Sequence, residues 1–380
     1  MVPHDNGLMA EPPLQFYMMK NGSTDRYQEH RPGRWVAEDA WPSKTVSSRV
    51  YSINSNSLDA VPLIETARLL SSPQTTGLSS GEQGSFAIVG DLPGDQSLDA
   101  FGSLQFDTAI LDEAVEILGN VEVEIELSSD RRDALLAARL IDVAPDGRAY
   151  QVTLGFLNLT HRDSSERPEA LIPGKRYRVR MKLFGVGYTF VQGHRIRLAL
   201  SSAYWPMVWP SPEHATLTVY TGSSQLTLPI RKASEKASEQ IKFPPPLKMD
   251  GIKKTVLRPG LVERSVTDDQ VTGEITHRLF IDGGVFGDWG RFLIDDIGLE
   301  TEHCYERTYS IKPSEPNSAK AKMTQSYDLS RGGWKIKVTA SADMTSTPTT
   351  FELFAWIEAF EGNELVRRRE WKASIPRDLV

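Results

Sequence analysis

The sequence has few of the residues that build disulfide scaffolds or metal centres. It holds one cysteine, Cys304, and seven histidines in 380 residues. A single thiol excludes a disulfide within the chain and a zinc site built from several cysteines. Neither H-x-H, H-E-x-x-H nor C-x-x-C spacing occurs. We therefore expect no metal and no other cofactor.

Long apolar runs and basic runs are also missing from the sequence. No stretch approaches the roughly 20 apolar residues that span a bilayer. The first 19 residues lack the basic head and apolar core of a signal peptide. The net charge is −7, without a long run of lysine or arginine, so we expect neither nucleic acid nor a membrane as partner. The expected location is the cytoplasm.

What the chain does contain is alternation of apolar and polar residues with a period of two. Residues 121–127 alternate valine, isoleucine and leucine with glutamate, and residues 195–200 alternate arginine with apolar residues. Such alternation is typical of a strand with one buried face. Helical periods do not intervene. The pattern predicts strands at 14–19, 121–127, 134–143, 150–159, 177–183, 194–201, 215–220, 225–230, 275–281, 299–311, 334–340, 351–360 and 365–371.

Turn signals separate these predicted strands. Asp146–Gly147, Pro173–Gly174, Gln192–Gly193 and Gly222–Ser223 lie between strands of the first series, and Gly332–Gly333 lies within the second. Many short strands joined by such turns favour an all-β fold. We predict a jelly-roll β-sandwich followed by a second antiparallel β domain whose strands form a meander.

Several motifs keep the order and spacing of a known family. Residues 140–147 read LIDVAPDG, residues 193–197 read GHRIR, and residues 128–130 read SSD. Together they resemble the C-terminal jelly-roll domain of X-Pro dipeptidyl-peptidases and cocaine-esterase-like serine hydrolases. The resemblance extends from about residue 94 to residue 229 and implies a galactose-binding-like jelly roll. In that family the domain packs on an α/β-hydrolase domain that carries the catalytic triad.

The resemblance also implies how the chain is divided. Residues 5–13 are similar to the segment that closes the family's hydrolase domain. We therefore predict the end of a hydrolase domain and a linker at 1–60, the jelly roll at 61–232, a linker at 233–254, and the antiparallel β domain at 255–380. In the family the triad precedes this region, so we expect no catalytic residue here and an inactive isolated chain.

The implied function is that of a non-catalytic part of a serine hydrolase. The intact family members are dipeptidyl-peptidases or esterases, and this part would support the hydrolase domain, its substrate pocket or oligomerisation. The expected partner is an α/β-hydrolase domain, in cis or in trans, and a homo-oligomer is a further expectation. The alternative hypothesis is an independent β-sandwich module that binds carbohydrate or protein.

Two motifs suggest chemistry within the chain itself. Gly77–Gly81 matches G-x-S-x-G, with Ser79 as nucleophile, but that motif requires a strand before the serine and a helix after it. The flanking residues predict neither, so we interpret the match as chance. His194 with Asp142 would offer a base and an acid. The simpler interpretation of His194 is an imidazole at a strand end, bonded to a carboxylate or carbonyl.

The loop at 204–210 reads YWPMVWP and is the candidate interface. Tyr204, Trp205 and Trp209 form a stiff amphipathic surface that suits a hydrolase domain or a ligand. The alternative is a loop folded onto its own sandwich. Trp35 and Trp41 invite the same interpretation. We expect Cys304 to be an inert, partly buried thiol and His161 to be a surface residue in a loop.

Overall fold

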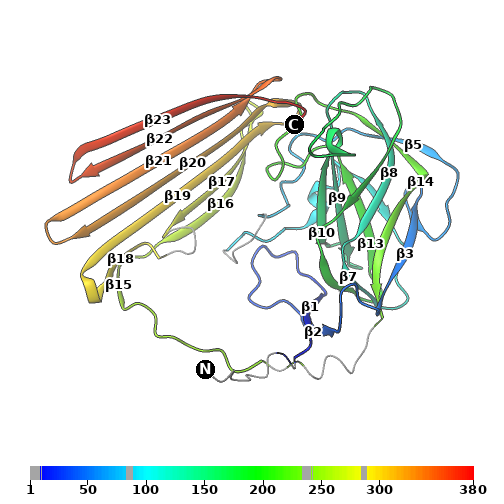
Figure 1. Cartoon of the computed structure of the whole chain (residues 1–380), viewed down its shortest axis with the longest axis horizontal. Helices are drawn as coiled ribbons and strands as arrows, with labels where there is room; N and C mark the ends of the chain where they lie inside the picture. The colour runs from blue at the N-terminus through cyan, green and yellow to red at the C-terminus, as the bar shows by residue number, and fades with distance from the viewer. Residues whose placement is uncertain (1–8, 10, 83–88, 233–240, 242, 284–288) are drawn as a thin grey trace. The chain divides into compact units, whose positions relative to one another are not determined.

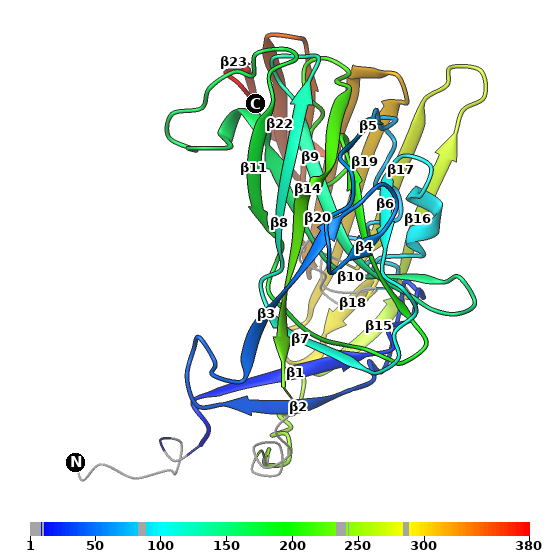
Figure 2. The same ribbon diagram turned by 90° about the vertical axis from the view of Figure 1, so that its right-hand side faces the viewer.

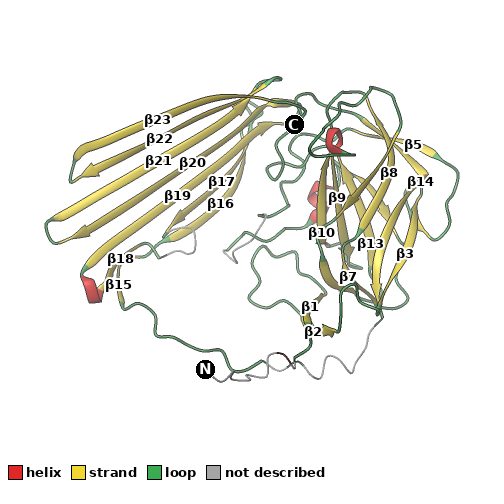
Figure 3. Ribbon diagram, viewed as in Figure 1, coloured by secondary structure: helices red, strands yellow, loops and turns green. Residues whose placement is uncertain are grey.

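Strands make up nearly all of the regular structure. The computed structural model describes residues 9, 11–82, 89–232, 241, 243–283 and 289–380. The helices of this part are single 3-10 turns, drawn red in Figure 3: η2 (Gln96–Asp99), η3 (Leu159–His161) and η4 (Asp295–Ile297). No helix among these residues is long and apolar enough to cross a membrane. The predicted all-β fold class is confirmed.

The chain forms two compact units. Unit 1 consists of Met1–Ser72, Pro93–Ser202 and Thr216–Leu247, and unit 2 of Pro73–Leu92, Ala203–Ala215 and Lys248–Val380. The two short segments of unit 2 interrupt the sequence of unit 1. The predicted domain boundaries were drawn as continuous ranges and stay a prediction. Most of the polar linker sequence at 232–240 lies outside the described residues.

Unit 1 is an antiparallel sandwich with one parallel pair, β1 with β12. Its larger sheet follows the order β11-β8-β14-β7-β12-β1-β2, with β3 and β5 pairing along β14 and β4 along β3. Figure 2 shows β11, β8 and β14 side by side. The strands of this sheet are β1 (Leu14–Lys20), β2 (Gly33–Glu38), β3 (Val46–Ile53), β4 (Leu58–Asp59), β5 (Thr66–Leu70), β7 (Val115–Gly119), β8 (Glu122–Ser129), β11 (Tyr177–Lys182), β12 (Val186–Phe190) and β14 (Leu217–Arg231).

The smaller sheet of unit 1 has the order β10-β9-β13-β6. Its strands are β6 (Leu104–Asp107), β9 (Leu135–Val143), β10 (Ala149–Asn158) and β13 (Arg195–Ser201). Every residue of β9 is buried, because this strand is central in its sheet. The Asp146–Gly147 turn joins β9 to β10 as predicted, and Gly147 has a positive φ of 90°.

The alternation predicted for residues 121–127 is present in β8. Val123, Ile125 and Leu127 are buried, while the glutamates between them lie on the opposite face. There they pair with basic residues of the neighbouring β11. Arg178 donates to both Glu124 and Glu126. The acidic row therefore belongs to a cross-strand ladder of opposite charges, which stabilises an antiparallel pair.

Two predictions for unit 1 are wrong. Only one strand, at 14–19, was predicted within residues 1–60, yet β2, β3 and β4 also lie there. Gly222–Ser223 was expected to be a turn, yet β14 continues through it with a register shift against β8. Gly222 has a φ of 86°, and the hydroxyl of Ser224 donates to the carbonyl of Tyr220 over 2.7 Å. The glycine therefore marks a β-bulge rather than a chain reversal.

Unit 2 is built on one nine-stranded antiparallel sheet, coloured yellow to red in Figure 1. From β19 to β23 the strands pair in sequence order, which confirms the predicted meander. The turn at Gly332–Gly333 joins β20 to β21 as expected. The strands are β15 (Lys254–Arg258), β16 (Leu261–Asp268), β17 (Ile275–Asp282), β18 (Arg291–Ile294), β19 (Leu299–Lys312), β20 (Glu315–Arg331), β21 (Trp334–Ser346), β22 (Thr350–Glu361) and β23 (Glu364–Pro376).

The strand β20 was not predicted. Its residues alternate small or moderately apolar side chains with lysine, threonine and serine, and alanine and lysine have low strand propensity. The strand forms because it pairs over most of its length with β19 on one side and β21 on the other.

A buried ion pair joins three strands of the larger sheet in unit 1. The side chain of Arg231, at the end of β14, has no exposed area. Its Nε donates to Glu38 of β2 over 2.6 Å, and Nη1 donates to Glu116 of β7 over 3.3 Å. Burial raises the pKa of Glu38, but hydrogen bonds from Ser43, Arg231 and Thr45 outweigh that effect and hold its pKa below 4.5.

We expect Arg231→Ala to lower the free energy of unfolding by about 3–5 kcal/mol, because the variant leaves the Glu38 carboxylate buried without its cation. Urea denaturation measures this difference. The control is Arg178→Ala, since Arg178 pairs with Glu124 and Glu126 at the surface and such pairs contribute about 0–1 kcal/mol. If both substitutions lowered the free energy of unfolding equally, the buried pair would contribute no more to stability than the surface pair.

Candidate functional site

The serine of the G-x-S-x-G match does not lie in a nucleophile elbow. β5 ends at Leu70, and residues 74–79 form turns. The described residues place no helix after Ser79, and residues 83–88 lie outside the description. Ser79 is 2% exposed. Because an elbow holds its serine at the exposed top of a sheet, the local structure does not provide what the motif needs.

A buried carboxylate connects the two sheets of unit 1. Asp142 lies on β9 of the smaller sheet, and its Oδ2 accepts a hydrogen bond from the hydroxyl of Tyr188 on β12 of the larger sheet, over 2.7 Å. Its Oδ1 lies 2.8 Å from Nδ1 of His194, which directly precedes β13. The Tyr188 hydroxyl in turn accepts the backbone N–H of Gly22 over 3.1 Å. We call Asp142, His194, Tyr188 and Gly22 the inter-sheet network.

The electrostatics of the inter-sheet network follow from burial. Burial raises the pKa of Asp142, and the hydrogen bonds from Tyr188 and His194 offset this only in part. Burial and the nearby Asp142 charge also raise the pKa of Tyr188, so this hydroxyl stays protonated and donates. With His194 Nδ1 donating to Asp142, a neutral imidazole leaves Nε2 as a hydrogen-bond acceptor. The simpler interpretation of His194, an imidazole bonded to a carboxylate, is the geometry observed.

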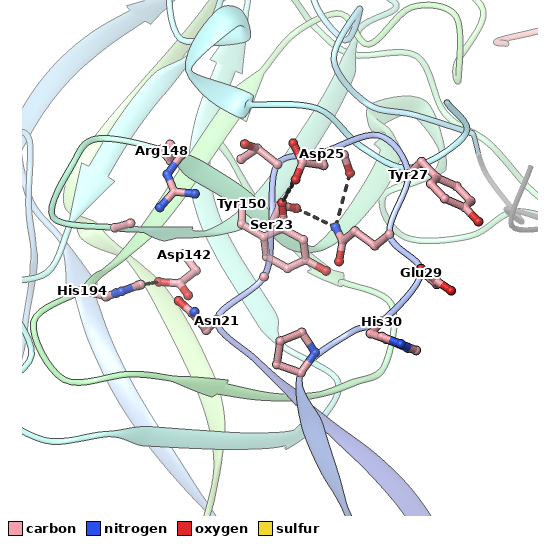
Figure 4. A pocket seen from close by; sticks show the side chains of 15 residues that line it. Asn21, Ser23, Asp25, Tyr27, Glu29, His30, Asp142, Arg148, Tyr150 and His194 are labelled. Carbon is pink, nitrogen blue, oxygen red and sulfur yellow. Dashed lines mark hydrogen bonds and ion pairs between the residues drawn. The ribbon is translucent and has the colours of Figure 1, made fainter. Parts of the chain in front are cut away.

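A polar cavity of about 440 Å³ lies beside this network in unit 1. Figure 4 shows Asp142, His194 and Asn21 on one side of it and Tyr27 and His30 on the other. The chain that encloses it is the loop 21–32, between β1 and β2. Its remaining lining residues are Gly22, Ser23, Thr24, Asp25, Gln28, Glu29, Pro32, Ala144, Arg148 and Tyr150.

The loop 21–32 is held in one shape by its own hydrogen bonds. Lys20 N–H donates to the Pro32 carbonyl over 2.9 Å and closes its base. The side chain of Gln28 donates to the carbonyls of Ser23 and Asp25. A Cβ at Gly22 would lie 2.4 Å from ring atoms of Tyr150, so this close approach requires glycine. The loop is therefore a compact, closed loop of the kind that often carries function.

The inter-sheet network lacks the parts of a nucleophilic triad. Among the described residues, no hydroxyl or thiol of a serine, threonine or cysteine forms a hydrogen bond with His194. Ser23 lines the same cavity, but its hydroxyl donates to Asp25 over 2.7 Å. Covalent catalysis needs a nucleophile within hydrogen-bond reach of its base, so the arrangement suits binding rather than acyl transfer.

The candidate interface loop lies inside unit 2. Tyr204 and Trp205 are each 1% exposed. The Trp205 ring packs edge to face on Tyr309 and on Trp209. Trp209 Nε1 donates to Ser346 of β21 over 3.0 Å. In this conformation a partner could not reach Tyr204 or Trp205, and an interface role for the three residues stays a prediction. The loop folds onto the second sheet, an arrangement the sequence did not suggest.

The structure also shows the surroundings of the remaining candidate residues, Cys304 and His161. Cys304 is partly buried, and burial with the neighbouring Asp282 carboxylate raises the pKa of its thiol to about 11. Asp282, Glu302 and Cys304 are the described residues that bring three metal-ligating groups together, but Arg258 forms ion pairs with both carboxylates. His161 ends η3 and is half-buried rather than a fully exposed loop residue.

Exposed aromatic residues gather on the hairpin of β1 and β2, at one edge of the larger sheet. Tyr17 and Trp35 are cross-strand partners, with ring centroids 5.5 Å apart. The Phe243 ring lies 4.8 Å from that of Trp35. Trp41, directly after β2, packs against Phe16 at 5.9 Å. Because neighbouring residues of a strand lie on opposite faces, the hairpin presents aromatic rings on both faces.

Known proteins share the sequence of unit 1. The family described as the X-Pro dipeptidyl-peptidase C-terminal non-catalytic domain matches residues 6–241. The chain belongs to this family. The inferred relation to cocaine-esterase-like serine hydrolases is confirmed, and the motifs that suggested it, 140–147 and 193–197, contain the Asp142 and His194 of the inter-sheet network.

The individual relatives are distant and longer. A protein of Mycobacterium bovis named as a serine esterase is 28% identical over 222 residues, which cover 52% of this chain and 33% of that protein. The cocaine esterase of a Rhodococcus species is 32% identical over 103 residues, 27% of this chain and 18% of the esterase. The match to the first of these spans about a third of that relative's length.

The comparison with solved structures also returns hydrolases. A CocE/NonD family hydrolase from Staphylococcus aureus is 18% identical, covers 60% of this chain and 43% of its own, and has a TM-score of 0.45. An aminopeptidase from a marine sediment Thaumarchaeota archaeon is 20% identical, with coverages of 52% and 39% and a TM-score of 0.46.

Sequence reasoning missed Tyr188 and the loop 21–32. Tyr188 lies in the stretch VGYTF, where a tyrosine among β-branched residues is ordinary for a strand. The loop lies within residues 1–60, for which only the strand at 14–19 was predicted. One signal was available, since Asn21–Gly22 is a typical turn dipeptide directly after the predicted strand at 14–19.

The raised pKa of Asp142 predicts the sign of a pH effect. Folded Asp142 holds its proton more tightly than the unfolded carboxyl, whose pKa is 3.8. Its contribution to stability is therefore complete below 3.8 and is lost as pH rises through the raised pKa. We expect the stability of the native chain relative to Asp142→Asn to fall over this window. Urea denaturation from about pH 3.5 to 7 measures it.

Asp146→Asn is the matched control, because Arg148 holds the pKa of Asp146 below its usual value through backbone and side-chain hydrogen bonds. The stability of the native chain relative to this variant should change in the opposite direction and rise with pH. If the stability differences of the two variants from the native chain changed with pH in the same direction, burial would not be the dominant influence on the pKa of Asp142.

The burial of Ser79 predicts that it will not react as a nucleophile. We expect a fluorophosphonate probe to leave Ser79 unlabelled, and p-nitrophenyl acetate to be hydrolysed equally by the purified chain and by Ser79→Ala. Mass spectrometry of the probe-treated chain and absorbance at the nitrophenolate band measure these outcomes. Labelling that disappears in Ser79→Ala would refute the prediction of no catalytic residue.

Proposed function

We propose that this chain acts as the non-catalytic C-terminal part of a dipeptidyl-peptidase or esterase of the serine hydrolase type. The observation that carries the proposal is the family match over residues 6–241, which covers most of unit 1. In this proposal an α/β-hydrolase domain, in cis or in trans, supplies the nucleophile and forms the acyl-serine intermediate. The chain described here supplies a rigid surface for that domain.

The β1–β2 hairpin is the surface best suited to hold the hydrolase domain. Trp35 and Trp41 are 41% and 50% exposed, and aromatic residues are the side chains most enriched at protein interfaces. β2 is the last strand of its sheet, so one side of its backbone is unpaired by strands of the described residues. An aromatic sheet edge of this kind favours a protein partner over continued exposure.

Docking at the hairpin would have consequences for the loop 21–32, which continues from β1 and returns into β2. A domain bound there would rest beside that loop, and the loop could form part of the wall of its substrate pocket. Without a hydrolase domain, the same aromatic residues would favour self-association. A galactose-binding-like relationship and a cytoplasmic location remain predictions from the sequence.

The proposal is tested with a tagged chain expressed in its own source cells. We expect a fluorophosphonate-reactive serine hydrolase to co-purify with it, or the label to lie on the same polypeptide if the hydrolase domain is in cis. In the trans case, Trp35→Ser with Trp41→Ser should reduce the co-purified label at least about tenfold, since paired aromatic anchors dominate interfaces. Gel fluorescence of the eluates measures the label.

The control pair is Trp289→Ser with Trp334→Ser, two tryptophans of unit 2 that are 50% and 43% exposed. These substitutions should leave the co-purified label unchanged. Absence of any fluorophosphonate-reactive protein from both the chain and its eluate would contradict the proposed function. Equal loss in both variant pairs would contradict docking at the β1–β2 hairpin.

A further inference from the structure

The proposed function places the loop 21–32 beside a docked domain but assigns no ligand to the cavity that this loop encloses. Its volume of about 440 Å³ lies within the range of roughly 300–1,000 Å³ that small-molecule sites occupy. The cavity has its shape before any ligand binds, because the hydrogen bonds of the loop 21–32 and the close approach of Gly22 to Tyr150 hold its walls. A cavity formed before the ligand arrives lowers the cost of ordering protein groups on binding.

The cavity offers polar groups that no described protein group satisfies. The Tyr150 ring stacks on Tyr188 with centroids 5.7 Å apart, yet its hydroxyl forms no hydrogen bond with the described residues. The same holds for the side chains of Asn21 and Glu29 and for Nε2 of His194, whose side chain is nine-tenths buried. Together these groups both donate and accept.

The charged side chains that line the cavity are bonded to different partners and do not face one common position. Asp142 already accepts from Tyr188 and His194, Asp25 accepts from Ser23, and Arg148 donates to Asp146. Among the described residues, three metal-ligating groups come within ligating distance of one another at Asp282, Glu302 and Cys304, and not here. The lining therefore suits a ligand with several separate hydroxyl groups better than a metal ion.

Two tyrosines contribute to the lining. The Tyr150 ring stacks on Tyr188, and Gly22 approaches the same ring closely. Tyr27 borders the cavity and is 53% exposed, and its ring points outward from the loop in Figure 4.

From these features we propose that the cavity enclosed by the loop 21–32 binds a neutral sugar or a polyol of similar size. The ligand's hydroxyls meet Tyr150, Asn21 and His194, and Tyr27 borders the site. The residues that line this site all belong to unit 1 of the chain itself.

The experiment is saturation-transfer NMR on the full chain with glucose, galactose, mannose and glycerol, followed by titration of whichever binds. We expect at least one of them to bind with a dissociation constant below about 10 mM. Tyr150→Phe removes a single hydroxyl and should weaken binding about five- to tenfold. Tyr27→Ala should weaken it by a smaller factor, because Tyr27 only borders the site.

Tyr327→Ala is the matched control, since Tyr327 is 43% exposed in unit 2; it should leave the affinity unchanged. Glycerol tests whether a ring is needed, and methylammonium tests whether the carboxylates select a cation. Three outcomes overturn the proposal: binding of none of the four polyols, binding unaffected by both Tyr150→Phe and Tyr27→Ala, or binding of methylammonium in their place. None of these outcomes bears on the fluorophosphonate experiment.

Discussion

The buried carboxylate of Asp142 is the constraint on which unit 1 depends. A charge in a sandwich interior is tolerated only when hydrogen bonds replace its water. Here the replacement comes from Tyr188 on the opposite sheet and His194 at the start of β13. Removing either donor would leave the Asp142 carboxylate with too few hydrogen bonds. The bond from Tyr188 joins the larger sheet to the smaller one, and the bonds from Tyr188 and His194 favour the ionised form of Asp142.

The same network determines the shape of the cavity. Tyr188 has one hydroxyl, which donates to Asp142 and accepts from the N–H of Gly22. The loop 21–32 is therefore linked through two hydrogen bonds to a residue more than a hundred positions away in the sequence. Low local dielectric strengthens such linked hydrogen bonds and makes an incomplete set costly. This explains why a polar cavity can persist beside the core without collapsing.

The sequence predicted the elements whose signal is local. β8 and β13 alternate apolar and polar residues, and the Asp146–Gly147 turn has the residue types that a tight reversal requires. The elements it missed depend on distant partners. β20 has weak strand propensity and is stabilised by its two neighbours. Gly222 has the sequence signal of a turn, but β3, β5 and β8 pair with β14 on either side of it, so the strand continues. For the site, the pair of Asp142 and His194 could be suspected, whereas Tyr188 and Gly22 join it only through the packing of two sheets.

The tryptophans also show that the sequence alone does not reveal which residues are buried by distant strands, and this difference matters for the proposed function. From composition alone, the loop at 204–210 and the segment around Trp35 and Trp41 are equivalent candidates for an interface, because both place indoles beside prolines or turns. Burial separates them. Trp205 is enclosed by Tyr309, Ile311 and Ala319 of the second sheet, so its hydrophobic free energy is already used within the chain. Trp35 and Trp41 keep large exposed areas on a sheet edge, and burial of that area by a partner would still contribute roughly 25 cal/mol per Å². Long-range strand pairing thus decides which aromatic residues stabilise the fold and which remain available for recognition.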